Sequence, residues 1–137
     1  METIKLATRT TINNLTGNEY PPMSVTIYHN PRCSKSRQTL ALLEENGIEP
    51  TVIEYLQTPP DAVALTTILE QLGMTAHELM RRGEDEYKAA KDTVSAMDNA
   101  AAIDWLVSTP KVIERPIVVT DKGARIGRPP ENVLEII

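Results

Sequence analysis

Residues 25–37 read VTIYHNPRCSKSR, and the interpretation of the whole chain starts from this stretch. The first four residues, VTIY, are β-branched or aromatic and predict a buried strand. The loop HNPRC follows and ends in Cys33. Ser34 or Ser36 can then cap a helix that runs to about Asn46. The stretch therefore predicts a strand, a short loop and a helix, with a cysteine at their junction.

The middle of the chain predicts one more strand and a set of helices. Residues 51–55, TVIEY, read as a second strand, parallel to the first because a helix connects the two. Residues 59–109 read as a helical insert in several pieces, with Thr75 as the cap of a helix over residues 76–81. Glu84 begins an acidic run that we expect to be a solvated helix start.

The C-terminal part completes an α/β fold. Residues 116–120 and 124–127 predict two strands joined by a tight turn. A last helix begins at Pro129-Pro130, with Val133, Leu134 and Ile137 expected to face inward. The order is β-α-β, a helical insert, then β-β-α. This is the element order of a thioredoxin-like fold with a mixed four-stranded sheet.

Composition restricts the class of protein. The chain has 137 residues, which corresponds to one domain, and Cys33 is its single cysteine, so neither a disulfide framework nor a Cys-rich zinc site can form. We expect no metal. The net charge of −5 argues against a general nucleic-acid-binding protein. No apolar run approaches the about 18–20 residues of a membrane span, and no secretory signal is evident, so the expected location is cytoplasmic.

The first composition shift suggests a domain boundary. Residues 1–22 are rich in Thr and Asn, show no sustained periodicity and end in two prolines. We expect a flexible leader here, with Met23 as a possible biological start and residues 23–137 as the domain. The alternative is an extra strand or arm packed on that domain.

The chemistry concentrates at Cys33. A cysteine at a helix N-terminus can have its pKa lowered from about 8.5 to as low as about 3.5–7.5, because the free backbone N–H groups stabilise the thiolate. Arg32, Lys35 and Arg37 add positive charge within four residues. The alternative is a buried, inert cysteine, but charged and polar neighbours do not suit burial.

Several arginines are placed where they can converge on this cysteine. Arg115 directly precedes Pro116, which opens a strand and is expected to be cis and to face the cysteine loop. Arg128 follows the strand pair, and Arg81 and Arg82 end a helix of the insert. Each could be a surface ion-pair partner. Three guanidinium groups converging on a thiolate would instead bind a tetrahedral oxyanion.

Four ordered motifs resemble the glutaredoxin-coupled arsenate reductase (ArsC) family. They are YHNPRCSKSR at residues 28–37, ELMRR at 78–82, ERPIVV at 114–119 and GRP at 127–129. The resemblance is closest to a bacterial subgroup that carries HNPRCSKSR. It implies that Cys33 is the nucleophile, that His29 and Ser36 tune its thiolate, and that three arginines bind the oxyanion, namely Arg81, Arg115 and Arg128. The choice of Arg81 over Arg82 as the third arginine depends on the alignment of one short helical motif.

The resemblance also implies the reaction. Arsenate would be reduced to arsenite through a covalent adduct on Cys33. A single cysteine cannot form an internal disulfide, so glutathione is expected as co-substrate and glutaredoxin as partner, with no bound cofactor. Arg32 and Lys35 replace small uncharged residues of the best-known members, which leaves the substrate open.

The residues around Cys33 also bear on three other functions. A phosphatase-type reductase needs Cys-x5-Arg, whereas Cys33 and Arg37 give Cys-x3-Arg. A glutathione-dependent thiol transferase would share the Cys-x-x-Ser pattern of Cys33 and Ser36. A thioredoxin-fold regulator that binds RNA polymerase is the non-enzymatic alternative, although such proteins often carry Cys-x-x-Cys at this place.

Overall fold

The computed structural model describes residues 24–137, so the expected leader and the possible start at Met23 lie outside the described residues. Four strands form one sheet in the order β3-β2-β4-β5. They are β2 (Val25–His29), β3 (Thr51–Glu54), β4 (Ile117–Thr120) and β5 (Gly123–Ile126). Strands β2 and β3 are parallel, while the β2–β4 and β4–β5 pairs are antiparallel. The predicted mixed four-stranded α/β sheet is confirmed.

Helix α1 (Ser34–Glu45) begins where the loop after β2 ends. Cys33 is its N-cap residue, with extended backbone angles, so the prediction that Ser34 or Ser36 caps the helix is wrong. Ser36 instead lies inside the first turn and is fully buried. Gly47, with φ of 77°, follows the C-cap Asn46 and ends the helix, because a left-handed residue cannot continue it.

The helices expected between the two halves of the sheet are present. Helix α2 (Ala62–Leu72) is capped by Asp61, whose carboxylate accepts a hydrogen bond from Ala64 N. The following elements are η1 (His77–Leu79), α3 (Asp85–Ser95), α4 (Asn99–Ser108) and η2 (Pro110–Val112). Thr75 Oγ1 accepts a hydrogen bond from Glu78 N at 3.2 Å, but the N-cap residue is Ala76, and only a short 3₁₀ turn forms where a helix over residues 76–81 capped by Thr75 was expected. Among residues 24–137, no helix combines the length and the apolar character needed to cross a membrane.

The C-terminal segment differs from the prediction. Residues 130–136 form a 3₁₀ helix, η3 (Pro130–Ile136), instead of an α-helix. Because a 3₁₀ helix has three residues per turn, Val133 and Ile136 lie on the same face, and both are buried. Leu134 is 41% exposed, so its predicted inward orientation is wrong. Ile137 is only partly buried.

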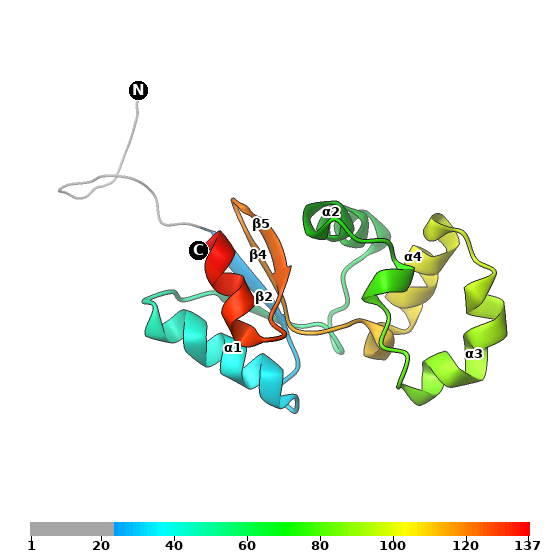
Figure 1. Cartoon of the computed structure of the whole chain (residues 1–137), viewed down its shortest axis with the longest axis horizontal. Helices are drawn as coiled ribbons and strands as arrows, with labels where there is room; N and C mark the ends of the chain where they lie inside the picture. The colour runs from blue at the N-terminus through cyan, green and yellow to red at the C-terminus, as the bar shows by residue number, and fades with distance from the viewer. Residues whose placement is uncertain (1–23) are drawn as a thin grey trace, which may run out of the picture.

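The sheet separates two apolar clusters, and Figure 1 shows the corresponding layers. Helix α1 and η3 cover one face, where Ile27, Val118 and Leu43 are fully buried. The helices between β3 and β4 form the second cluster, which includes Leu65 and Leu106. With no Phe in the chain, aliphatic side chains fill most of both clusters. The loop that carries Cys33 leaves the sheet at the end of β2, between these two layers.

Candidate active site

Cys33 is held at the tip of a hydrogen-bonded loop. Its backbone N–H donates to Asn30 O at 3.0 Å, and its carbonyl accepts from Arg37 N at 3.0 Å. The first bond closes the turn after β2, and the second closes the first turn of α1. The side chain is partly exposed, so the sulfur is fixed in position and still accessible.

The surroundings of the sulfur favour the thiolate. Partial burial acts to raise the pKa of Cys33, but the Ser36 backbone N–H, Arg115 and Arg128 all act to lower it, and the net shift is downward. A cysteine with a lowered pKa and an accessible sulfur has the properties of a nucleophile rather than of an inert core residue. Two of the three expected arginines, Arg115 and Arg128, therefore act on Cys33.

Arg115 and Arg128 both leave the β4–β5 hairpin at its open end, where Ile117 pairs with Ile126. Arg115 precedes Pro116 at the start of β4, and the peptide bond between them is cis as predicted. Arg128 follows β5, and its bond to Pro129 is also cis, which the sequence analysis did not predict. Arg128 Nη1 lies 3.7 Å from Cys33 Sγ and donates to Arg115 O at 3.2 Å.

A glycine allows this close approach. Gly127 N donates to Pro116 O at 2.9 Å, directly before Arg128. A Cβ atom on Gly127 would overlap Thr39 Oγ1 and would lie 2.9 Å from Pro116 Cγ. The absence of a side chain therefore lets the end of β5 pack against α1 and the cis proline, which brings Arg128 to the cysteine loop.

Two carboxylates link the arginines, and the sequence analysis did not identify them. Glu84 Oε2 accepts from Arg81 Nε at 3.2 Å and from Arg115 Nη1 at 3.4 Å. Glu114 Oε1 lies 2.6 Å from Arg81 Nη1 and 3.8 Å from Arg128 Nε. The expected helix start at Glu84 is confirmed, because Glu84 is the N-cap residue of α3. Its expected solvation is wrong, because its side chain is only 18% exposed and paired.

The choice between the two adjacent arginines follows from these contacts. Arg81 belongs to the ion-pair network that contains Arg115 and Arg128. Arg82 is exposed, and its guanidinium carbon lies 5.9 Å from the centroid of the Tyr87 ring. Arg81 therefore lies beside the candidate site and Arg82 does not, although no direct contact joins Arg81 to the sulfur in the described residues.

His29 and Ser36 pair with each other beneath the loop. His29 Nδ1 lies 2.6 Å from Ser36 Oγ, which also accepts from Asn30 N at 3.0 Å, and both side chains are buried. Burial lowers the pKa of His29, and Arg37 acts the same way while Glu54 opposes it, so the ring is neutral near pH 7. These two side chains hold the loop through their hydrogen bonds. The group of Ser36 that lowers the pKa of Cys33 is its backbone N–H.

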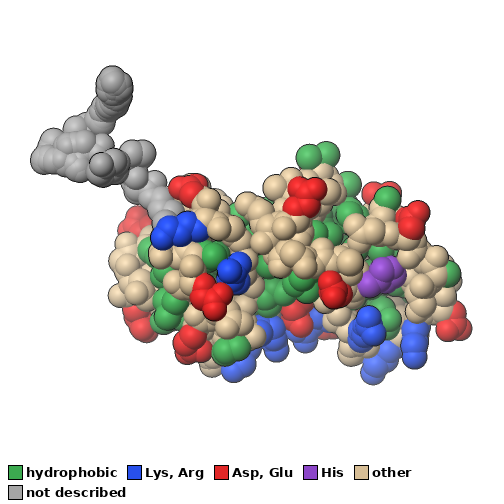
Figure 2. Space-filling model, turned by 45° about the horizontal axis from the view of Figure 1, so that its top comes forward, with side chains coloured by type: hydrophobic (Ala, Val, Ile, Leu, Met, Phe, Trp, Pro, Cys, Tyr) green, Lys and Arg blue, Asp and Glu red, His purple; other side chains and the backbone are tan. Residues whose placement is uncertain are grey.

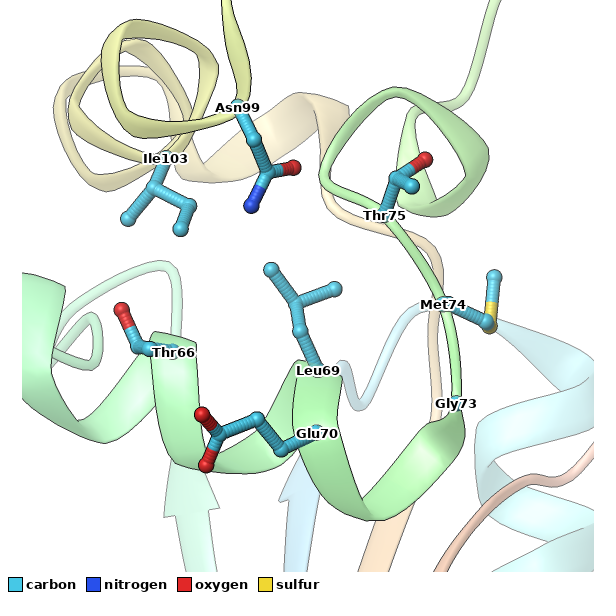
Figure 3. Close-up of a pocket in the computed structure, with 8 residues that line it drawn as sticks. All are labelled: Thr66, Leu69, Glu70, Gly73, Met74, Thr75, Asn99 and Ile103. Carbon is cyan, nitrogen blue, oxygen red and sulfur yellow. The ribbon is translucent and has the colours of Figure 1, made fainter.

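Two hollows lie outside the cluster formed by Arg81, Arg115 and Arg128. One of about 310 Å³ borders the cysteine loop and is lined by His29, Asn30, Pro31, Arg32, Glu54, Leu56 and Gln57. The other, of about 320 Å³, lies between α2 and α4. There, Leu69 on α2 faces Asn99 and Ile103 on α4 (Figure 3), and none of the residues that line it belongs to the arginine cluster.

Positive charge is concentrated although the net charge is −5. In Figure 2, most of the visible Lys and Arg side chains lie along the lower edge and others lie at the left, while acidic side chains are spread over the face. Around Cys33, the exposed residues Arg32 and Arg37 add to this charge, and Arg37 Nη1 also donates to Pro31 O at 2.9 Å.

A cysteine of lowered pKa at a helix N-terminus, next to converging arginines on a mixed four-stranded sheet, is typical of a thioredoxin-like protein that carries out thiol chemistry on an anion. The chain belongs to the ArsC family, whose family model matches residues 28–136.

Known proteins of several bacteria are similar to this chain. It is 58% identical over 114 residues to a protein of Escherichia coli K12 named "Uncharacterized protein YfgD". The aligned region covers 82% of this chain and 96% of that protein. An arsenate reductase of the same organism is 40% identical over 114 residues, 83% of this chain and 81% of the relative. The solved structure titled arsenate reductase from Vibrio cholerae has a TM-score of 0.81 and 50% sequence identity, covering 85% of this chain and 100% of that one.

Proposed function

We propose that this protein reduces arsenate to arsenite through Cys33, with electrons from glutathione and glutaredoxin, in the cytoplasm. The observation that carries the proposal is the sulfur of Cys33 with Arg128 Nη1 at 3.7 Å and a pKa lowered by Arg115 and Arg128 against the effect of burial. Membership of the ArsC family, and relatives named arsenate reductase at 40% and 43% identity, support arsenate as the substrate.

The first step forms a covalent bond. The Cys33 thiolate attacks the arsenic atom of arsenate, a sulfur–arsenic bond forms, and one arsenate oxygen leaves as water after protonation. Arsenic remains As(V) in this adduct. Arg115 and Arg128 hold the charge on the remaining oxygens in place of solvent, which lowers the energy of the crowded transition state. Arg81 adds a third positive charge through the network that it shares with them.

The second step carries the two electrons. The thiolate of glutathione attacks the sulfur of Cys33, and the sulfur–arsenic bond breaks with its electron pair retained by arsenic. Arsenite leaves, and Cys33 remains as a mixed disulfide with glutathione. Since Cys33 is the single cysteine of the chain, no internal thiol can resolve this disulfide. A glutaredoxin thiolate therefore attacks it and regenerates the Cys33 thiolate.

A coupled assay tests the proposal. Arsenate-dependent oxidation of NADPH is followed in the presence of glutathione, glutaredoxin and glutathione reductase. We expect turnover by the wild-type protein, its loss when glutathione or glutaredoxin is omitted, and its loss in Cys33→Ser.

Three results would contradict parts of this account. Turnover in Cys33→Ser would remove the nucleophile. Turnover with thioredoxin and thioredoxin reductase in place of glutathione and glutaredoxin would replace the reductant. Reduction of mixed disulfides between glutathione and proteins, without any activity on arsenate, would make the protein a thiol transferase.

A further inference from the structure

Tyr55 carries a buried hydroxyl that the ion-pair network does not use. The residue follows β3 directly, is 1% exposed and is among the largest fully buried side chains. Its Oη atom has no hydrogen-bond partner among residues 24–137. A buried hydroxyl without a partner costs about 1–3 kcal/mol, so a fold that retains one needs a reason.

The topology brings Tyr55 to the cysteine loop. Strands β2 and β3 are parallel, and His29 pairs with Glu54 at their carboxyl ends. The next residues along the two strands are Asn30 and Tyr55, so both chain segments leave the sheet at its carboxyl end. Asn30 O accepts the hydrogen bond from Cys33 N. Tyr55 also lines a small apolar cavity together with Glu114, which is paired with Arg81.

The charges of the site act on the Tyr55 hydroxyl. Burial is the largest influence and raises the pKa of Tyr55, Arg115 and Arg81 act to lower it, and Cys33 acts to raise it. The Asn30 side chain also acts to lower it, without meeting the geometry of a hydrogen bond. With the net shift upward, the phenol is protonated near pH 7 and can donate.

Arg115, which acts on the pKa of Tyr55, carries a second buried donor. Arg115 Nε is also buried without a hydrogen-bond partner in the part of the chain that the structure describes, although Arg115 Nη1 contacts Glu84. Two buried donors without partners among residues 24–137, one on a residue that acts on Cys33 and one on a residue on which Cys33 acts, fit an acceptor that arrives with the substrate. A tetrahedral oxyanion offers several oxygens and can accept from both.

We infer that the Tyr55 hydroxyl is a further oxyanion ligand, which donates a hydrogen bond to an oxygen of the bound arsenate on the side opposite the exposed loop. The inference rests on the proposed oxyanion chemistry at Cys33. Tyr55 and Arg115 Nε together close the buried end of the site, while Arg128 contacts the sulfur from its more exposed side.

The variant Tyr55→Phe tests this role with little structural cost. The lost hydroxyl has no partner among the residues that the structure describes, so we expect the free energy of unfolding to stay the same or to rise. The apparent KM for arsenate should rise by roughly 10- to 100-fold, the value of one hydrogen bond to a charged group. The pH profile of Cys33 alkylation without oxyanion should not change, because Tyr55 is not among the groups that act on the sulfur.

The control is Tyr87→Phe, which removes a hydroxyl from another largely buried tyrosine, on α3. It should leave the KM for arsenate within about twofold of wild type. A second measurement does not depend on reduction: arsenate and phosphate should protect Cys33 from iodoacetamide, and Tyr55→Phe should weaken that protection by a similar factor.

The outcomes separate this inference from the proposed function. Weaker protection in Tyr55→Phe, in a protein that does not reduce arsenate, would support the ligand and contradict the reductase. Unchanged KM and unchanged protection would overturn the inference, and so would a wild-type Cys33 that neither oxyanion protects. A loss of stability in Tyr55→Phe that accounts for the weaker binding would also overturn it.

Discussion

Arg128 Nη1 lies 3.7 Å from Cys33 Sγ, although the two residues are 95 positions apart in the sequence. The contact joins the two ends of the domain, since Cys33 follows the first strand described and Arg128 follows the last. It also explains why the sulfur favours the thiolate, because a guanidinium at this distance stabilises negative charge.

Replacing Arg128 with Ala is predicted to raise the pKa of Cys33. Burial acts to raise this pKa and is opposed in part by Arg128, so the opposition weakens in the variant. The midpoint of the rate of iodoacetamide alkylation against pH should move upward, and the rate below that midpoint should fall. Arg125→Ala is the control, because Arg125 pairs with Glu135 at 2.8 Å and is not among the groups that act on Cys33. An unchanged profile in Arg128→Ala would contradict the prediction.

Arg81→Ala is predicted to weaken arsenate binding, while Arg82→Ala is not. Arg81 shares Glu84 with Arg115 and Glu114 with Arg128, whereas Arg82 is exposed over Tyr87. We expect the apparent KM for arsenate to be at least about tenfold higher in Arg81→Ala, because this factor corresponds to the free energy of one hydrogen bond to a charged group. In Arg82→Ala we expect a change below about twofold. Equal effects of the two substitutions would assign Arg81 no role in the site.

Glu84→Gln is predicted to lower the free energy of unfolding at pH 7 by about 1.5–3 kcal/mol. Burial acts to raise the pKa of Glu84, but hydrogen bonds and charge from Arg81 and Arg115 act to lower it, and the net shift is downward. Its stabilising effect is therefore complete above the pKa of an unfolded glutamate and is lost as pH falls through the lower pKa of the folded protein.

Urea unfolding of wild type and Glu84→Gln across pH measures this effect. The difference between them should shrink as the solution becomes acidic. Glu135→Gln is the matched control, because its carboxylate is 63% exposed in its pair with Arg125, and it should cost about 0–1 kcal/mol. A Glu84→Gln difference that persists unchanged at low pH would show that the ion pairs are not its cause.

Gly127→Ala is predicted to destabilise the protein by about 1–3 kcal/mol and to move Arg128 away from the sulfur, because the new Cβ would overlap Thr39 Oγ1. The pKa of Cys33 should rise, as in Arg128→Ala. Gly83→Ala is the control, since its Cβ would have no atom within 4 Å, and it should change stability by about 0.5 kcal/mol or less. A Gly127→Ala protein with wild-type stability would contradict the close packing described here.

Local patterns were sufficient to predict the fold and the position of Cys33 at the start of α1. The β-branched run before Cys33 and the helix signals after it gave β2 and α1 nearly to the residue. Arg115 could also be identified as a candidate, because it directly precedes the proline that opens a strand and this motif is contiguous in the sequence. Where the 3.6-residue pattern was short, as at Leu134, the prediction was wrong because a 3₁₀ helix turns every three residues.

The parts of the site that depend on distant pairs could not be predicted. Glu84 and Arg115 are 31 positions apart, and Arg81 and Glu114 are 33 apart, so nothing in the sequence joins them before the chain folds. An acidic residue at a helix start also has an ordinary explanation in the helix dipole. Tyr55 resembled any strand-end aromatic residue, and only the absence of a partner for its hydroxyl among residues 24–137 distinguishes it.

The central claim is that the Cys33 sulfur reduces arsenate, and the most direct test is to measure the arsenic species themselves. Arsenate is incubated with the protein, glutathione and glutaredoxin, and arsenate and arsenite are separated by chromatography and quantified over time. The account predicts arsenite formation that is proportional to wild-type protein and falls to the protein-free background in Cys33→Ser. Arsenite formation by Cys33→Ser at the wild-type rate, or none by a folded wild-type protein, would contradict it.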